Sequence, residues 1–452
     1  MKICQNCNAL IETATGTLIK GCVNTVIPMG VTAIGKDAFS WSKVTDVIIP
    51  TGVTAIGDNA FDHCYEITRL SLPGTLLTIG DNAFDAAYKF NDLTIPGSVT
   101  SIGKYAFHCC NGLSGIRFEE GSPLVLGDCA FYQCSGLKSV VMPNTLQSVG
   151  DYCFFECDSL TSVFVSASVS HIGCAAFGGC PLLAEMKVDS ANPVLDARDS
   201  CNAIIETASG ILVAGCLATV IPVGVTALGD GAFAECIGLN TIFIPEGVTR
   251  IGEYAFDCCY DLDTIVLPHS LVTIGDYAFA SCESLVYMTI PDAVTSIGES
   301  AFYDCPWMSY LTLGKELSFI GDGAFNGCNL IKVNCRANIP PEIAAISSFW
   351  HYGEFSNAIL KVPAQALQRY QNADYWSLFP QIVADGDLTG DGRVNMDDLT
   401  AMIGCLVGYG TTNLQYFTAD VNNDNRFNMD DLTTLINWLV FGYGWPESEL
   451  NQ

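Results

Sequence analysis

The chain has 452 residues, of which half are hydrophobic and only 15% are charged, and it contains 42 glycines. This composition excludes intrinsic disorder and favours strands that are buried on both faces. The formal net charge of −29 argues against binding to nucleic acid or to an anionic membrane, because both require a basic face. Divalent cations are the natural partners of so much carboxylate, and no apolar segment is long enough to cross a bilayer.

The first residues, MKICQNCNALIETATG, lack the charged and then apolar layout of a signal peptide. A series of similar segments follows, beginning with VTAIGKDAF (31–39) and VTAIGDNAF (53–61) and ending with LSFIGDGAF (317–325). Their last residue recurs mostly at intervals of 22 to 24 residues, at Phe39, Phe61, Phe84, Phe107, Phe131, Phe154, Phe177, Phe233, Phe256, Phe279, Phe302 and Phe325. Such periodicity is typical of repeat proteins.

Each repeat begins with an apolar alternation that ends at proline, as in ITRLSLP (67–73) and LNTIFIP (239–245). The alternation predicts a short strand, which ends because proline cannot donate to a ladder. In the VTxIGxxAFxxC segment that follows, we expect the glycine at a tight bend and AFxxC to return to the core. One such unit cannot bury its own face, so the repeats are predicted to stack into a β-rich solenoid with ~23 residues per turn.

Ten of the twelve segments carry the cysteine of AFxxC: Cys64, Cys110, Cys134, Cys157, Cys180, Cys236, Cys259, Cys282, Cys305 and Cys328. Equivalent residues of successive turns form a line, and cysteine is among the most buried residue types, so core packing is the favoured interpretation. A zinc site needs ligands that converge, and disulfides between neighbouring turns would be strained.

The 33 residues that begin at Cys7 return at Cys201 with identity at two thirds of the positions. Cys22 and Cys216 are also equivalent, and each cysteine pair flanks a predicted hairpin, so a disulfide in each pair is an alternative to free thiols. The chain starts almost directly on this segment. A longer natural N-terminus that includes a signal peptide is therefore a second open alternative.

The sequence contains no catalytic motif, and its five histidines fall at non-equivalent positions, so we predict that the protein is not an enzyme. Outward strand positions are predicted to carry Arg69, Arg117, Phe164, Phe243, Tyr287 and Tyr310. Tyr287 and Tyr310 occupy equivalent places in adjacent turns. They are expected to form a stacked aromatic strip, which would suit a protein or glycan ligand.

The LxxIxI frame and the IGxxAFxxC segment resemble bacterial leucine-rich repeats of the BspA-like type. The resemblance implies a curved, β-rich, right-handed leucine-rich repeat solenoid over residues 1–336. Residues 337–384, in which the repeat signal fades and aromatic residues become more frequent, are expected to form the C-terminal cap and linker.

Two Asp- and Asn-rich loops follow, DLTGDGRVNMDD (387–398) and DVNNDNRFNMDD (420–431), and each leads into an apolar helical segment. EF-hand loops bind calcium at positions 1, 3, 5, 7, 9 and 12, with position 7 contributing its main-chain carbonyl. These positions are Asp387, Thr389, Asp391, Arg393, Asn395 and Asp398 in the first loop, and Asp420, Asn422, Asp424, Arg426, Asn428 and Asp431 in the second. Two Ca²⁺ sites are therefore predicted, and position 8 is apolar in both loops, as core packing requires.

The paired loop–helix units resemble a type I dockerin module, which implies a small all-α, calcium-dependent domain over residues 385–452. In that family the helices bind a cohesin domain of a scaffold or cell-surface protein. Positions 10 and 11 contribute to this contact, and they are Met396 with Asp397 and Met429 with Asp430. Thr389 departs from the usual Asn or Asp, and Met-Asp departs from the Ser-Thr pair that is common in cellulosomal dockerins.

Together, the two resemblances imply a non-catalytic, secreted or cell-surface binding protein that docks on a larger complex. One alternative is an accessory subunit, or a cryptic glycoside hydrolase, of a polysaccharide-degrading complex. The other is an adhesin for host proteins in which the C-terminal module is a calcium-stabilised cap. The ligand of the solenoid, the identity of the cohesin and the oligomeric state stay open.

Overall fold

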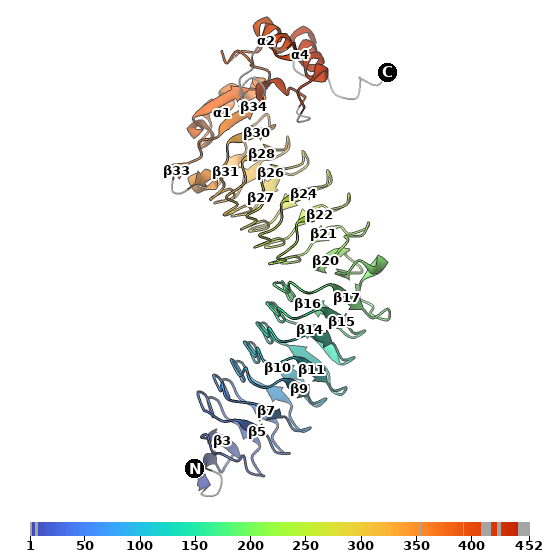
Figure 1. Cartoon of the computed structure of the whole chain (residues 1–452), viewed down its shortest axis with the longest axis vertical. Helices are drawn as coiled ribbons and strands as arrows, with labels where there is room; N and C mark the ends of the chain where they lie inside the picture. Colours follow the sequence, from blue (N-terminus) through green and yellow to red (C-terminus); the bar gives the residue numbers. More distant parts are fainter. Residues whose placement is uncertain are drawn as a thin grey trace. The chain divides into compact units, whose positions relative to one another are not determined.

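Short strands from the two halves of the repeat alternate along most of the chain (Figure 1). The computed structural model describes residues 2–4, 8–351, 354–391, 393–407, 417–422 and 426–441. Among these residues, no helix has the length and apolarity needed to span a bilayer. The chain forms two compact units, Met1–Leu262 and Asp263–Gln452.

The repeats of the first unit form one continuous parallel ladder and a second set of strands, which is divided among three separate parallel sheets. The continuous ladder comes from the VTxIG segments and contains β4 (Ala33–Ile34), β6 (Ala55–Ile56), β8 (Thr78–Ile79), β10 (Ser101–Ile102), β12 (Leu124–Leu126), β14 (Leu146–Val149) and β16 (His171–Ile172). The strands before the prolines are β5 (Asp46–Ile48), β7 (Arg69–Ser71), β9 (Asp92–Ile95), β11 (Gly115–Phe118), β13 (Ser139–Val141), β15 (Ser162–Val165) and β17 (Glu185–Val188). The sequence predicted only this second set.

The first unit contains two antiparallel hairpins, as the duplicated segment predicted, one before the first regular turn and one between regular turns. The first comprises β2 (Ala9–Glu12) and β3 (Thr17–Lys20), and β1 (Lys2–Cys4) pairs with β2. The second comprises β19 (Ile204–Glu206) and β20 (Ile211–Ala214), preceded by β18 (Leu195–Asp196) and the 3-10 helix η1 (Arg198–Ser200). Regular turns then return with β21 (Ala227–Leu228), β22 (Thr241–Phe243) and β23 (Arg250–Ile251).

The second unit continues the same two-strand pattern and ends in helices. One set of strands is β24 (Thr264–Val266), β26 (Tyr287–Thr289), β28 (Tyr310–Leu313), β30 (Lys332–Cys335), β34 (Ile359–Val362) and β35 (Gln381–Ala384), and the other is β25 (Thr273–Ile274), β27 (Ser296–Ile297), β29 (Phe319–Ile320) and β31 (Glu342–Ile343). The remaining elements are η2 (Ile346–Phe349), β32 (Trp350–His351), β33 (Glu354–Phe355), η3 (Ala364–Ala366), α1 (Leu367–Asn372), η4 (Trp376–Leu378), α2 (Met396–Leu406) and α4 (Met429–Phe441). The predicted fold class, a β-solenoid followed by a small helical module, is confirmed.

The core of each unit is a column of stacked phenylalanines. The rings of Phe39 and Phe61 lie 4.8 Å apart in the first unit, and those of Phe279 and Phe302 lie 5.0 Å apart in the second. Phe349 adds a further ring, 5.3 Å from Phe325, although the repeat signal has already faded at this residue. These fully buried aromatic side chains are among the largest in the core, and stacking of the turns removes their apolar area from water.

Close approach of successive turns, rather than a tight bend, requires the glycine of the VTxIG segment. A Cβ atom on Gly57 would lie 2.8 Å from the main-chain nitrogen of Lys36 in the preceding turn, and a Cβ atom on Gly103 would lie 2.7 Å from that of Asp81. The left-handed backbone conformation occurs two residues later, at Asn59, for example, with a φ of 54°. A tight bend does begin at this glycine, since the amide of Ala60 donates to the main-chain carbonyl of Gly57 at 3.2 Å, but it is the neighbouring turn that leaves no room for a side chain.

Nine of the ten cysteines of AFxxC are buried along the core, as predicted, whereas Cys236 is half-buried, and several also make a hydrogen bond that the sequence did not reveal. The thiol of Cys64 donates to the main-chain carbonyl of Phe39 at 3.0 Å, and that of Cys328 donates to Phe302 at 3.1 Å. Burial raises the pKa of Cys64 to about 11, so the thiol is un-ionised at neutral pH. Cys201 and Cys216 are both free thiols. Cys7 lies outside the described residues, and the alternative of a Cys7–Cys22 disulfide therefore stays a hypothesis.

Candidate metal centre and docking surface

The first acidic loop begins directly after β35, where the chain leaves the last parallel strand. Asp387 and Asp398, at loop positions 1 and 12, are both buried. The hydroxyl of Thr389 lies between them, 3.4 Å from Oδ1 of Asp387 and 3.0 Å from Oδ1 of Asp398. Three predicted ligand residues of this loop therefore converge on one point.

A capping box at the start of α2 fixes the position of Asp398. Its Oδ2 accepts from the amide of Asn395 at 2.8 Å, and its Oδ1 accepts from the amide of Thr389 at 2.9 Å. The side chain of Asn395 in turn accepts from the amide of Asp397 at 2.7 Å. Asp391 accepts from the amide of Arg393 at 2.9 Å, so a hydrogen bond also links positions 5 and 7 of the loop.

The second loop repeats this arrangement around Asp431, which is fully buried. Its carboxylate accepts from the amides of Val421 at 2.9 Å and Asn428 at 2.8 Å. The side chain of Asn428 accepts from the amide of Asp430 at 2.6 Å. Asp420, Asn422 and Arg426 lie on the same loop, whereas Asp424 lies outside the described residues.

The two loop–helix units share one small core, in which α2 and α4 lie side by side (Figure 1). Met402, Cys405 and Leu435 are buried in it, and Val394 and Phe427, at position 8 of the loops, pack against it. This confirms the core role predicted for position 8. The core contains few residues, so its apolar burial alone provides limited stability.

The donor set and its charge fit a calcium ion. The carboxylates of Asp398 and Asp431 accept only from amide and hydroxyl groups in the described part of the chain, where neither has a Lys, Arg or His partner. A buried carboxylate without a cationic partner is costly, and hard oxygen ligands are those that Ca²⁺ prefers. The residues present are thus suited to hold such an ion.

The predicted partner-binding residues lie at the first turn of each helix and are exposed. Met396 is 63% exposed and Met429 is 61% exposed, and the adjacent Asp397 and Asp430 are also exposed. Further exposed apolar residues continue along the same helices at equivalent places, namely Ile403 on α2 with Val407 directly after this helix, and Ile436 and Val440 on α4. Sequence reasoning missed these four residues, although their 33-residue spacing could have revealed them.

A buried lysine joins the end of the solenoid to this module. Lys361, on β34, lies 3.4 Å from the carboxylate of Asp385 and donates to the main-chain carbonyl of Asp420 at 3.0 Å. The ring of Phe417 lies 5.2 Å from its ammonium group and 4.8 Å from that of Lys332. Position 1 of the second loop is therefore in direct contact with the last strands of the solenoid.

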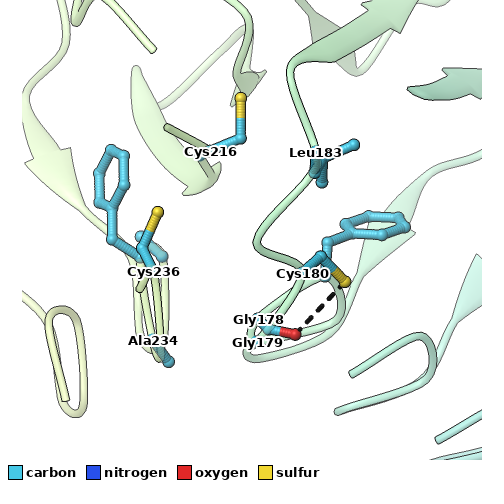
Figure 2. A pocket seen from close by; sticks show the side chains of 11 residues that line it. Gly178, Gly179, Cys180, Leu183, Cys216, Ala234 and Cys236 are labelled. Carbon is cyan, nitrogen blue, oxygen red and sulfur yellow. Dashed lines mark hydrogen bonds between the residues drawn. The ribbon is translucent and has the colours of Figure 1, made fainter. Parts of the chain in front are cut away.

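A small cavity lies in the first unit, where the long interval separates Phe177 from Phe233 (Figure 2). Cys180, Cys216 and Cys236 contribute to its lining. Its volume of about 10 Å³ is room for about one water molecule, which makes it too small for an organic ligand.

The outward surface of the second unit carries the predicted aromatic pair, with the rings of Tyr287 and Tyr310 stacked at 4.9 Å.

Comparison with known proteins supports both resemblances, that of the repeats to leucine-rich repeats and that of the C-terminal loops to a dockerin. The family model for the BspA type leucine rich repeat region matches residues 20–124, 116–198 and 216–335, and the model for the dockerin type I domain matches residues 385–440. Dockerin type I domains bind calcium and imply a cohesin partner, whereas leucine-rich repeat domains are typically non-catalytic interaction modules. Proteins of both types are typically extracellular or attached to the cell surface.

Solved structures with similar folds include the pneumococcal vaccine antigen PcpA, with a TM-score of 0.58 at 19% identity over 78% of this chain and 84% of that chain. A leucine-rich repeat protein from Bacteroides ovatus has a TM-score of 0.44 at 27% identity, over 68% of this chain and 82% of that chain. A leucine rich cell surface protein from Faecalibacterium prausnitzii gives 0.46 at 20% identity, covering 85% and 95%. No curated protein sequence gives a significant match. The chain therefore belongs to the BspA-type leucine-rich repeat family and carries a C-terminal type I dockerin domain.

Proposed function

We propose that the chain is a non-catalytic, secreted or cell-surface binding protein that is tethered to a larger complex through its C-terminal module. In this proposal residues 1–336 form the binding solenoid, residues 337–384 form its cap and linker, and residues 385–452 form the dockerin. The observation that carries it is the pair of equivalent buried carboxylates, Asp398 and Asp431.

Two Ca²⁺ sites would be formed by these loops. Asp387, Thr389, Asp391, Asn395 and Asp398 would hold one ion together with the main-chain carbonyl of Arg393, and Asp420, Asn422, Asp424, Asn428 and Asp431 would hold the other together with that of Arg426. A bound Ca²⁺ neutralises the clustered carboxylates and supplies free energy of folding. The loop amides already orient Asp398 and Asp431 for this role.

The cohesin partner would contact the exposed surface at the start of the two helices. Met396 with Asp397, and Met429 with Asp430, occupy equivalent positions 33 residues apart. The exposed apolar residues on the same helices, such as Ile403 and Ile436, give each half a similar stripe. Because the halves are equivalent, either one can face a cohesin.

Variants of each half test this proposal. The full chain would be titrated in Ca²⁺ with a panel of type I cohesin domains, and then with the variants Met396→Ala/Asp397→Ala, Met429→Ala/Asp430→Ala and their combination. We expect each half-variant to bind within a few-fold of the wild type and the combination to bind more than about 100-fold more weakly, because it removes central anchors from both faces. Tyr287→Ala, on the solenoid, is the control and should bind normally. Wild-type affinity in the combined variant would refute this docking surface.

We further propose that the solenoid contributes a separate ligand surface around the stacked Tyr287 and Tyr310. Tyr287 is 67% exposed, and strand register places it directly beside Tyr310. Exposed stacked aromatic rings suit a protein or a glycan ligand. This surface belongs to the solenoid repeats, so its binding should persist in calcium chelator.

A further inference from the structure

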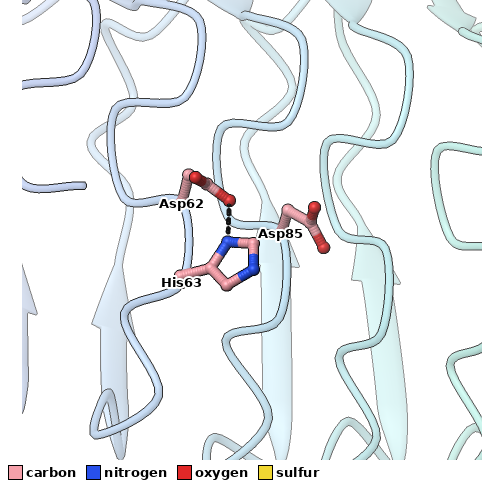
Figure 3. A group of neighbouring side chains, drawn as sticks. All are labelled: Asp62, His63 and Asp85. Carbon is pink, nitrogen blue, oxygen red and sulfur yellow. Dashed lines mark hydrogen bonds and ion pairs between the residues drawn. The ribbon is translucent and has the colours of Figure 1, made fainter. Parts of the chain in front are cut away.

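Three potential metal ligands meet on the first unit, on two successive turns of the solenoid (Figure 3). Asp62 and His63 directly follow Phe61, and Asp85 directly follows Phe84, the equivalent residue of the next turn. The amide of His63 donates to the main-chain carbonyl of Asp85 at 2.8 Å. The backbone that carries the three side chains is therefore fixed by the contact between turns.

The distances between the side chains suit a small cation. A ring nitrogen of His63 and one carboxylate oxygen from each aspartate all lie within 4.8 Å of one another. Tetrahedral zinc, with bonds of about 2.0–2.2 Å, needs ligands separated by about 3.4 Å. Binding of Zn²⁺ would therefore draw the ligand atoms closer together by a small rotation of these side chains.

The charge of the cluster also favours a cation. In the part of the chain that the structure describes, the only ion pairs of Asp62 and Asp85 are with histidines, namely His63 and His108. The two carboxylates are mostly shielded from water, with side-chain exposures of 17% and 16%. A divalent ion would neutralise the negative charges of both carboxylates. The histidines can do so only in their protonated form.

Neighbouring side chains hold the ligands in position. The indole ring of Trp41, in the preceding turn, stacks on His63 with centroids 4.2 Å apart. Nδ1 of His108, in the following turn, lies 2.8 Å from Oδ1 of Asp85. Histidine–carboxylate contacts of this kind orient metal ligands and tune their affinity in known sites.

We propose that Asp62, His63 and Asp85 form a Zn²⁺ site, separate from the calcium loops, with a fourth position open to water. An imidazole and two carboxylates are suitable zinc ligands, and the imidazole disfavours calcium, which takes oxygen ligands only. The ion would link two successive turns of the solenoid. His108 is a positioning residue in this site, because it acts through Asp85.

A calorimetric titration of the full chain with Zn²⁺, carried out in excess Ca²⁺, tests the site by measuring the stoichiometry and affinity of Zn²⁺ binding. The test variants are His63→Gln and Asp85→Asn, and the matched control is His171→Gln, which changes an exposed histidine of the same unit. We expect each test variant to lose one equivalent of bound Zn²⁺ or to bind it at least tenfold more weakly, and the control to bind as the wild type does. His108→Gln should weaken binding by about 10–100-fold without changing the stoichiometry.

Metal-free thermal unfolding of each variant shows whether the solenoid remains folded. With folding intact, wild-type stoichiometry and affinity in both His63→Gln and Asp85→Asn would overturn the proposal. Equal loss of Zn²⁺ in the His171→Gln control would also overturn it, because binding would then reflect general histidine content. If either test variant unfolds, the remaining one and His108→Gln still decide the outcome.

Discussion

The ammonium group of Lys361 donates a hydrogen bond to the main-chain carbonyl of Asp420 at 3.0 Å. Lys361 lies on β34, in the segment assigned to the cap of the solenoid, and is almost fully buried, whereas Asp420 opens the second predicted calcium loop. The same ammonium group lies 3.4 Å from the buried carboxylate of Asp385. One side chain thus contacts the residue two positions before the first acidic loop and the first residue of the second.

Replacing this lysine should destabilise the second unit. Lys361→Met removes the cation beside buried Asp385, and breaking a buried pair in this way costs about 3–5 kcal/mol. Urea unfolding of the full chain would measure the loss, with exposed Lys315→Met as the control. Adding Asp385→Asn should recover part of the stability, and an unchanged unfolding transition in Lys361→Met would contradict this role.

Two adjacent aspartates separate the metal role from the docking role. Asp398→Asn removes a buried charge at position 12, so it should weaken Ca²⁺ binding by about tenfold or more. Asp397→Asn changes an exposed charge at position 11 and should leave Ca²⁺ affinity nearly unchanged. Calorimetric Ca²⁺ titration measures both, and equal effects would show that burial of Asp398 has no part in metal binding.

Glu235 should make stability depend on pH near neutrality. Burial, followed by the negative charges of Glu156 and Asp257, raises the pKa of Glu235 to about 7. Because the folded-state pKa lies above the ordinary value of 4.5, the protonated form favours folding, and this contribution is lost as the pH rises through 7. Glu235→Gln should therefore raise the Tm of the first unit at pH 8 but not at pH 5. Equal Tm shifts at the two pH values would disprove the assignment.

The core cysteines should be unreactive in the folded protein. Burial raises the pKa of Cys64 to about 11 and that of Cys236 to about 12, whereas Cys22 is exposed. With Cys4 and Cys7 replaced by serine, a disulfide reagent at pH 8 should label Cys22 rapidly and Cys64 only after denaturation. The fast phase should disappear in Cys22→Ser. Rapid labelling of most thiols in the native protein would rule out the buried ladder.

The repeat period predicted the solenoid, the phenylalanine column and the stacking of Tyr287 on Tyr310, because a fixed period brings equivalent residues of successive turns together. The sequence did not reveal that VTxIG forms a second strand, since two-residue strands carry too little alternation to be recognised. The role of Gly57 was misjudged for a related reason. Glycine is required at this position because the preceding turn leaves no room for a Cβ atom, and not because of its own backbone conformation.

At the candidate site, EF-hand spacing predicted which residues share a loop, and the structure brings Asp387, Thr389 and Asp398 together. Whether these residues bind Ca²⁺ stays a prediction. The contact between Lys361 and Asp420 could not be predicted, because it joins residues 59 positions apart that belong to different parts of the chain. No local pattern encodes such a pairing.

The most direct test of the central claim is the affinity of the full chain for type I cohesin domains, measured with Ca²⁺ and with chelator. The account predicts that at least one cohesin binds in Ca²⁺ and that binding is lost in chelator and in the variant Asp398→Ala/Asp431→Ala. Binding of equal strength with and without Ca²⁺, or in that variant, would contradict it.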